Sequence, residues 1–367
     1  MLKYLRLLLF PFSLLYGLVV TMRNWFYDAR LFKSSEFDVP VICVGNLDVG
    51  GAGKSPMTEY LVRLLKSEFK LATLSRGYGR QTKGFLIANS HANHLGAMAS
   101  ATKNTAAQLG DEPAQFAQKF PNVTVAVCEK RADGIERLQE NHDLIILDDA
   151  FQHRAVKPGF SVLLFDYNRL NEPHLLLPAG NLREPFIGRY RADGFIVSKC
   201  PPDLSEAQQL DIIAQLRPLN DQKVFFTAIT YLPLQRLDGG EEALVPNNDT
   251  TVFLLTGIAN ATPLLQHLGK ITSNIVHHKY ADHHQFSLKN IVKLAQDFNN
   301  CTDAQKVIIT TEKDAQRLRD PELLPVLNTL PVMVLPIGIS FLNRGEVQFN
   351  KMIFNYVRQY TTHRSIH

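Results

Sequence analysis

Cysteine and net charge are both scarce in this sequence. The 367 residues include four cysteines (Cys43, Cys128, Cys200 and Cys301), which lie far apart and form no C-x-x-C pair. This spacing is typical of reduced core residues in a cytosolic protein and speaks against a disulfide framework. The formal net charge of +4 is too small to indicate a nucleic-acid partner, so we expect none. Apolar residues make up 45% and charged residues 20%, as in globular proteins, and the length allows two α/β units with real cores.

A long unbroken hydrophobic run is also lacking near the N-terminus. The apolar stretch 7–22 is interrupted by Pro11, Ser13 and Gly17, whereas a membrane-spanning helix needs about 20 apolar residues. Basic residues flank it on both sides: Lys3, Arg6, Arg23, Arg30 and Lys33. Trp25, the only tryptophan, follows it with other aromatic residues, as in helices that lie in a membrane interface. We predict that residues 1–33 form a membrane-associated helix lying on the surface, with a single transmembrane anchor as the alternative.

The strongest motif is a glycine loop in residues 41–56, which read VICVGNLDVGGAGKSP. An apolar strand precedes the loop and a helix-periodic segment follows it, which is the context of a phosphate-binding loop. In the pattern G-x-x-x-x-G-K-[ST] the first glycine falls on Asp48, so the strict motif is missed by one residue. We predict a nucleoside triphosphate site, with Lys54 at the outer phosphates and Ser55 at Mg²⁺. The predicted loop residues are Asp48, Val49, Gly50, Gly51, Ala52, Gly53, Lys54 and Ser55.

A pair of acidic residues, Asp148-Asp149, follows the apolar run 144–147. A carboxylate that directly follows a buried strand emerges at the carboxyl edge of the sheet, opposite the glycine loop, and there it can make the second Mg²⁺ contact. We therefore predict that this pair coordinates the metal or its water. A helix N-cap is the alternative.

Other polar segments carry less specific signals. Arg76 and Arg80 lie on a glycine-flanked turn, where they could clamp phosphate or simply be solvated. Asp111 follows Gly110 at the expected start of a helix, where an acidic residue is ordinary dipole complementation. His283 follows an aspartate and could act as a general base, since imidazole titrates near neutral pH.

The order of apolar strands and helices predicts an α/β fold. Repeated β-α units indicate a parallel sheet with helices on both faces and ligands at the carboxyl ends of the strands. Composition shifts at 232–249, where the chain is polar and aperiodic. We predict a P-loop NTPase-like parallel sheet domain at 34–231, a second, smaller α/β domain at 232–367, and the N-terminal membrane-associated helix at 1–33.

Taken together in order, the motifs resemble one family, the tetraacyldisaccharide 4'-kinases (lipid A 4'-kinases) of Gram-negative bacteria. The resemblance covers nearly the whole chain and rests on these segments: the glycine loop, Ser75-Arg76-Gly77-Tyr78-Gly79-Arg80, Gly110-Asp111-Glu112-Pro113, Asp148-Asp149-Ala150-Phe151-Gln152-His153-Arg154, Leu182-Arg183-Glu184-Pro185, Asp282-His283 and Thr311-Glu312-Lys313-Asp314. It implies transfer of the ATP γ-phosphate to the 4'-hydroxyl of a tetraacylated glucosamine disaccharide-1-phosphate, forming lipid IVA, with Mg²⁺. It also implies a place on the cytoplasmic leaflet of the inner membrane, and we expect a monomer.

The resemblance also implies roles for individual residues. Asp111 and His283 look like the base dyad of the family, Lys54 binds phosphate, and Arg183 is a candidate for phosphate charge. The candidates for the metal are Ser55, Asp148, Asp149 and Glu184. Ala150 stands where the family usually has glycine, and a positive φ there would strain it.

Two alternative functions remain at this point. One is a membrane-associated nucleotide switch, although Ser198-Lys199-Cys200-Pro201 lacks the Asn and Asp expected of a guanine site. The other is a P-loop kinase of a soluble small molecule, in which residues 1–33 would be a packing helix.

Overall fold

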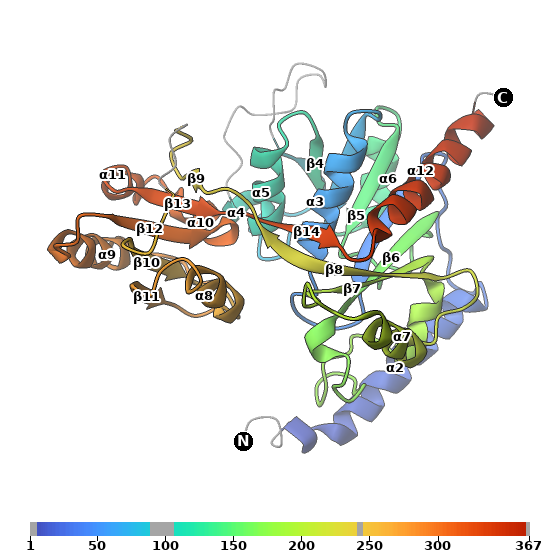
Figure 1. The fold of residues 1–367 in the computed structure, drawn as a ribbon. Coiled ribbons are helices and arrows are strands. Elements are labelled where there is room, and N and C mark those ends of the chain that lie inside the picture. The colour runs from blue at the N-terminus through green and yellow to red at the C-terminus, as the bar shows by residue number, and fades with distance from the viewer. Residues whose placement is uncertain (1–5, 89–105, 241–244, 365–367) are drawn as a thin grey trace.

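Two separate β-sheets form the framework of the protein in a computed structural model, which describes residues 6–88, 106–240 and 245–364. The larger sheet has nine strands in the order β14 (Ile337–Phe341), β8 (Lys223–Tyr231), β7 (Gly194–Ser198), β6 (Phe160–Asp166), β1 (Val41–Asn46), β5 (Leu144–Asp148), β2 (Leu71–Ser75), β4 (Thr124–Val127) and β3 (Leu86–Ile87). The smaller sheet has five, in the order β11 (Ile275–Lys279), β10 (Thr251–Thr256), β12 (Lys306–Thr311), β13 (Val332–Leu335) and β9 (Gln235–Arg236). Each sheet belongs to one of two units that lie side by side (Figure 1).

The large sheet is parallel from β8 to β4, as the alternation of strands and helices predicts, and only its edge strands β14 and β3 run antiparallel to their neighbours. Apolar side chains alternate between its faces, so that Ile42 and Val44 of β1 enter one core and Val41 and Cys43 the other. The first core is covered by α3 (Lys54–Leu65), α5 (Asp111–Lys119) and α12 (Gly345–Arg364), and the second by α6 (Arg131–Leu138) and α7 (Glu206–Leu216). The carboxyl ends of the parallel strands therefore share one edge, where the motifs gather.

The small unit repeats this arrangement. Its strands β11, β10, β12 and β13 are parallel, and β9 adds an antiparallel edge. The helix α8 (Thr262–Leu268) packs on one face, whereas α9 (Leu288–Asn300), α10 (Glu312–Leu318) and α11 (Leu324–Leu327) pack on the other. A short helix of the large unit, α4 (Ala106–Leu109), precedes α5.

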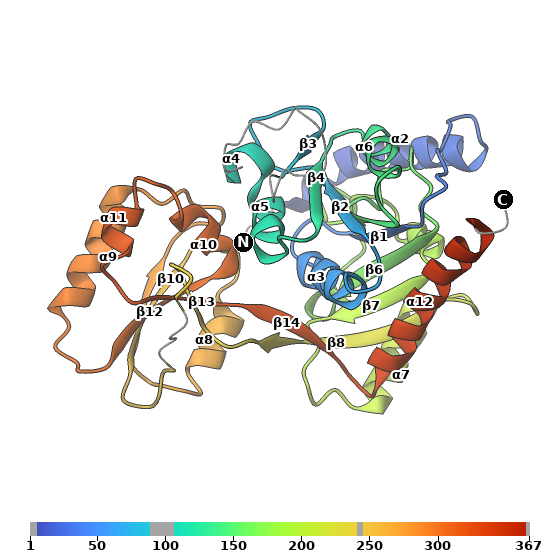
Figure 2. The same ribbon diagram turned by 90° about the horizontal axis from the view of Figure 1, so that it is seen from above.

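The C-terminal part of the chain departs from the predicted division at 232–367. β14 pairs with β8 in the large sheet, and α12 packs its Phe349, Ile353 and Val357 into a core of the large unit. Figure 2 shows β8 and β14 running together between the two units. The expected second domain is therefore wrong for residues after 336, because the partners of this strand and helix lie far back in the sequence.

The N-terminal helix α2 (Phe10–Asp28) lies along the outside of the large unit (Figure 1). It docks through a narrow stripe, Ser13, Gly17 and Val20, which is buried. Gly17 lets the helix approach closely, since an added Cβ would lie 2.7 Å from a methyl group of Leu176, which would have to move. The opposite surface exposes large apolar side chains: Phe12, Leu14, Leu15, Leu18, Val19, Met22 and Trp25. Within the described residues, no helix has both the length and the apolar character that crossing a membrane requires. Lys3, one of the predicted flanking cations, lies outside those residues.

Candidate active site

The glycine loop joins β1 to α3 and forms the floor of a cavity between the two units. Its glycines adopt conformations that other residues rarely take, with φ of +108° at Gly50 and +82° at Gly53. Lys54 opens the helix and donates to the side-chain oxygen of Asn46 at 3.0 Å. The predicted strand, loop and helix are therefore all present, and the positive end of α3 faces the loop.

Side chains from the ends of β6 and β7 hold the carbonyl groups of this loop. Arg169 donates to the carbonyl oxygen of Val49 at 2.8 Å, and the Ser198 hydroxyl donates to that of Ala52 at 2.8 Å. Lys199 binds the carbonyl oxygen of Gly51 and forms an ion pair with Asp166 at 2.7 Å. The loop is thus fixed in shape by bonds to its acceptors, which leaves its N–H groups as the natural contacts for an anion.

Asp48, the residue that breaks the strict motif, lies apart from the cavity. It lines a small neighbouring hollow with Arg169 and His174, whereas the cavity is lined by Val49, Gly50, Gly51, Gly53, Lys54 and Ser55. Burial raises the pKa of Asp48, although Arg169 and His174 oppose this shift. Its position does not require glycine, because the turn residues with positive φ come later in the loop.

The predicted acidic pair lies directly beside Lys54, and its two members differ in environment. Asp148 is buried and accepts a hydrogen bond from the Thr58 hydroxyl at 3.1 Å. Burial raises its pKa to about 7, and the charges of Glu112 and Asp149 add to the effect. Asp149 has a φ of +49° and lies 3.7 Å from the Lys54 ammonium. Burial opposes the ionisation of Asp149, yet Lys54 and Arg183 together lower its pKa.

Ala150 stands where the family usually has glycine, and the structure shows whether this position needs a positive φ. The strained conformation of this turn falls on the aspartate and not on Ala150, whose φ is not positive. Asp tolerates the left-handed region better than most residues do. Alanine therefore replaces the usual glycine without backbone strain.

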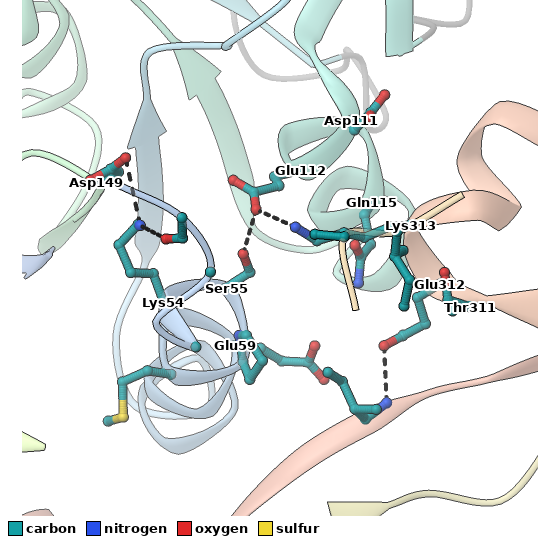
Figure 3. A pocket seen from close by; sticks show the side chains of 18 of the residues that line it. Lys54, Ser55, Glu59, Asp111, Glu112, Gln115, Asp149, Thr311, Glu312 and Lys313 are labelled. Carbon is teal, nitrogen blue, oxygen red and sulfur yellow. Dashed lines mark hydrogen bonds and ion pairs between the residues drawn. The ribbon is translucent and has the colours of Figure 1, made fainter. Parts of the chain in front are cut away.

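Glu112 was not among the predicted site residues, yet it lies at the centre of the cavity (Figure 3). Its carboxylate accepts the Ser55 hydroxyl at 2.7 Å and binds the Lys313 ammonium of α10 at 2.9 Å. Burial opposes its ionisation, but Lys313 and Ser55 hold the pKa of Glu112 below its usual value. The sequence offered one signal for a role of Glu112, its position next to Asp111. Acidic residues are also common in the first turn of a helix for dipole complementation, so this signal was not specific.

Asp111 and His283, predicted as a dyad, come from different units and meet at the mouth of this site. Asp111 is the first residue of α5, and His283 lies on the loop after β11 with a φ of +56°. The His283 Nδ1 atom lies 3.4 Å from Asp111 Oδ2. Two groups separated by 172 residues of the chain are thus brought together, as a shared role in proton transfer requires.

Arg183 and Glu184 are neighbours in sequence, but only the side chain of Arg183 reaches the cavity. Arg183 donates to both carboxylate oxygens of Asp149, at 2.7 and 3.2 Å, and so reaches the site. Glu184 has no exposed surface and accepts hydrogen bonds from Arg191 at 2.8 Å and from Gln152 at 2.9 Å. It is absent from the lining of the cavity. The structure does not bring Glu184 to the other metal candidates, because its carboxylate is buried against Arg191 and Gln152, outside the lining of the cavity.

Three arginines that no local sequence pattern brings together line the same cavity and form a wall of cations. They are Arg23 from α2, Arg76 after β2 and Arg131 at the start of α6, and the cavity is also lined there by His153 after β5, whose imidazole is neutral near pH 7. Arg131 is 3% exposed, and burial followed by the charge of Arg76 lowers its pKa. Burial and then Arg131 and Arg76 lower the pKa of His153 to about 4. Within the described part of the chain, the buried Nε atoms of Arg23 and Arg131 have no hydrogen-bond partner. Such a group of cations suits an anionic ligand.

Arg80, the second arginine of the glycine-flanked turn, does not join this wall. Its guanidinium binds Glu129 at 2.5 Å and the carbonyl oxygen of Gly84 at 2.6 Å. The position of Arg131 at the start of the helix that follows β4, at the carboxyl edge of the sheet, was the signal that could have identified the wall.

The cavity as a whole has a volume of about 3170 Å³, which exceeds the 300–1,000 Å³ typical of small-molecule pockets. It therefore has room for two ligands at once. Across residues 6–88, 106–240 and 245–364, no group of three or more His, Cys, Asp or Glu side chains is arranged to hold a metal by itself.

Comparison with known proteins gives a consistent result. A family model described as tetraacyldisaccharide-1-P 4'-kinase matches residues 5–357. The tetraacyldisaccharide 4'-kinase of Flavobacterium psychrophilum is 44% identical over 367 residues, which covers 98% of this chain and 99% of the relative. The corresponding protein of Bacteroides thetaiotaomicron is 41% identical over 372 residues, with 97% and 94% covered. Among solved structures, the "apo" form of LpxK from Aquifex aeolicus in complex with ATP is similar, with a TM-score of 0.72, 29% identity, and 96% of this chain and 99% of that chain covered.

Proposed function

This chain belongs to the tetraacyldisaccharide-1-P 4'-kinase family, and we propose that it transfers the γ-phosphate of ATP to the 4'-hydroxyl of a tetraacylated glucosamine disaccharide-1-phosphate. The product would be lipid IVA, an intermediate of lipid A biosynthesis. The observation that carries this proposal is that a phosphate loop and an Asp-His pair from two different units line one cavity with room for both substrates. Family membership does not favour the alternative of a nucleotide switch or of a kinase with a soluble acceptor.

ATP is the donor in this proposal, and the glycine loop is its phosphate site. The loop N–H groups and the end of α3 would bind the phosphate oxygens, and Lys54 would reach the outer ones. Lys54 and Arg183 are both bound to Asp149. An incoming phosphate would compete with this carboxylate for the two cations, which places them where charge develops during transfer.

Mg²⁺ fits the acidic surroundings of Ser55. The pKa of Asp148 is raised to about 7 by burial and by the neighbouring carboxylates of Glu112 and Asp149, so negative charge accumulates here without full compensation. Ser55 and Asp148 would hold the ion, and the nucleotide phosphates would complete its ligands, since Mg²⁺ usually takes only one or two carboxylates from the protein. The ion would neutralise charge on the transferred phosphoryl group.

Asp111 and His283 would take the proton of the acceptor. As the 4'-oxygen forms its bond to the γ-phosphorus and the bond to ADP breaks, the hydroxyl proton would pass to Asp111, with His283 stabilising or sharing it. Most of the rate acceleration in phosphoryl transfer comes from holding the acceptor oxygen in line with the bond that breaks and from electrostatic stabilisation. The loose transition state requires little covalent catalysis.

The cationic wall would receive the phosphate that the acceptor already carries. Arg23, Arg76 and Arg131 face the cavity, and two of them have buried Nε groups without a partner among the described residues. A guanidinium fork matches phosphate oxygens in geometry as well as in charge. Since Arg23 belongs to α2, the wall also connects the acceptor site with the N-terminal helix.

The exposed face of α2 would lie on the cytoplasmic leaflet of the inner membrane. The acyl chains of the acceptor favour the bilayer, so the enzyme must lie against it and let only the sugar enter the cavity. The exposed apolar side chains of α2 form one face of the helix, opposite the docking stripe.

The decisive experiment measures product formation from radiolabelled ATP with the purified protein, Mg²⁺ and a tetraacylated disaccharide-1-phosphate in detergent. We expect a labelled lipid whose label is at the 4'-position. Phosphorylation of a soluble sugar or nucleotide without phosphorylation of the lipid would refute the proposed acceptor.

A further inference from the structure

We propose that Arg317 is a positioning residue that holds Asp111 and the His283 loop in one arrangement across the two units. The inference rests on the proposed function, because it assigns Arg317 a role in placing the proton-accepting pair. Arg317 lies near the end of α10 in the small unit, and its side chain is 1% exposed.

The first contact of Arg317 reaches into the large unit. Its Nε donates to Asp111 Oδ2 at 3.1 Å. The same oxygen lies 3.4 Å from His283 Nδ1, so Arg317 and His283 share one acceptor atom. The orientation of the Asp111 carboxylate is therefore set by the guanidinium, which is fixed by burial, more than by the exposed imidazole.

The second set of contacts fixes the loop that carries His283. Arg317 Nη1 donates to the carbonyl oxygens of Gly257 at 3.3 Å and His284 at 3.2 Å. The Gly257 carbonyl oxygen also accepts the backbone N–H of His283 at 3.0 Å. Because His283 has a φ of +56°, which a non-glycine residue rarely adopts, its conformation needs such support.

Arg317 is itself held in place by a buried carboxylate. Asp314 has no exposed surface and lies 3.2 Å from Arg317 Nη1. Its other oxygen accepts the Gly257 N–H at 3.1 Å and the Thr311 hydroxyl at 2.8 Å. Asp314, Arg317 and Gly257 therefore form a closed ring of hydrogen bonds.

This arrangement uses a property of arginine that lysine lacks. The planar guanidinium points Nε at Asp111 and Nη1 at two carbonyl oxygens, whereas an ammonium is a single point charge that cannot reach both sides in a fixed geometry. Thr311 and Asp314 of the Thr311-Glu312-Lys313-Asp314 motif thus form, with Arg317, one hydrogen-bonded cluster that joins the two halves of the dyad.

The test compares Arg317→Gln and Arg317→Lys with a matched control, Arg319→Gln. Arg319 lies on the turn after α10 and also bridges to α5, through Gln118 at 2.7 Å, but has no bond to Asp111 or to the His283 loop. We expect Arg317→Gln to lower kcat about 10- to 100-fold with KM for ATP within about twofold, because a displacement of about 1 Å costs this much in a positioned reaction. Arg317→Lys should recover less than about a tenth of the lost turnover, and Arg319→Gln should keep wild-type kcat.

A double variant with Asp111→Asn separates positioning from folding. If Arg317 acts through Asp111, the loss of turnover in Asp111→Asn/Arg317→Gln is well below the product of the two single losses. Because Arg317→Gln leaves the buried carboxylate of Asp314 without its cation, the same comparison is repeated in an Asp314→Asn background, which removes that charge, and the Tm of every variant is measured. Multiplicative losses, full recovery by lysine, or an equal loss in Arg319→Gln would overturn the inference. Lack of lipid phosphorylation by the wild-type protein, measured in parallel, would instead refute the proposed function.

Discussion

Replacing two leucines on the outer face of α2 should detach the protein from membranes. Leu15 and Leu18 are 61% and 58% exposed and point away from the stripe through which the helix docks. Fully burying a leucine is worth about 1.5–3 kcal/mol, so the exposed part of each contributes about 1–2 kcal/mol on a bilayer. Replacing both leucines therefore removes about 2–4 kcal/mol of membrane-binding free energy, which corresponds to at least a roughly 20-fold weaker partition into the bilayer. Glutamate at these positions adds repulsion from anionic lipids and makes this a lower limit.

The assay is co-sedimentation of Leu15→Glu/Leu18→Glu with vesicles that contain anionic lipid. Leu210→Glu is the control, since Leu210 on α7 is 65% exposed in the same unit but is not part of α2. We expect the control to sediment like the wild type. The turnover of the double variant on acceptor dissolved in detergent should stay close to that of the wild type, because the active site is unchanged. Equal sedimentation of the double variant and the wild type would refute the assignment of α2 to the membrane surface.

Three other predictions address residues that the sequence assigned to the site. Lys54→Ala should lower kcat roughly 100-fold or more through loss of a cation at the transferred phosphate, and near-normal turnover would contradict the phosphate-loop assignment. Because burial, followed by Glu112 and Asp149, raises the pKa of Asp148 to about 7, the folded protein binds this proton more tightly than the unfolded chain does. Stability should therefore fall as pH rises from about 4 to 7, and Asp148→Asn should flatten this part of the Tm profile of the metal-free protein; parallel profiles would contradict the assignment. Glu184→Ala should lower the free energy of unfolding by about 3 kcal/mol by leaving the Arg191 cation unpaired, while the Mg²⁺ dependence of any remaining activity stays unchanged.

The glycine loop and the acidic pair could be predicted because their signals are local. β1, the loop and α3 are consecutive, and the glycines mark the turn by their conformational freedom. Asp148 and Asp149 follow a strand that is apolar throughout, as a strand buried on both faces must be. The predicted bounds of these elements agree with the structure to within a few residues.

The features that the sequence did not reveal depend on contacts between distant segments. Arg23, Arg76 and Arg131 come from three elements, and only the packing of α2 and α6 on the large sheet makes them one wall. The return of β14 to β8 is equally non-local, since Ile337 pairs with Tyr231, which lies far back in the sequence. The helix α7, in contrast, begins with a capping box formed by Ser205 and Gln208, a local signal that sequence reasoning could have used.

The pairing of β8 with β14 makes the small unit an insertion in the large one. The chain leaves the large sheet after Tyr231 and re-enters it at Ile337, and these two residues face each other in the antiparallel ladder. Partners in such a ladder lie only about 5 Å apart, so a two-residue turn can join them. A shortened chain that replaces residues 232–336 with Asn-Gly would therefore keep every strand of the large sheet. It would offer the phosphate loop and α2 as a module without His283 and Arg317, in which nucleotide binding can be studied apart from transfer.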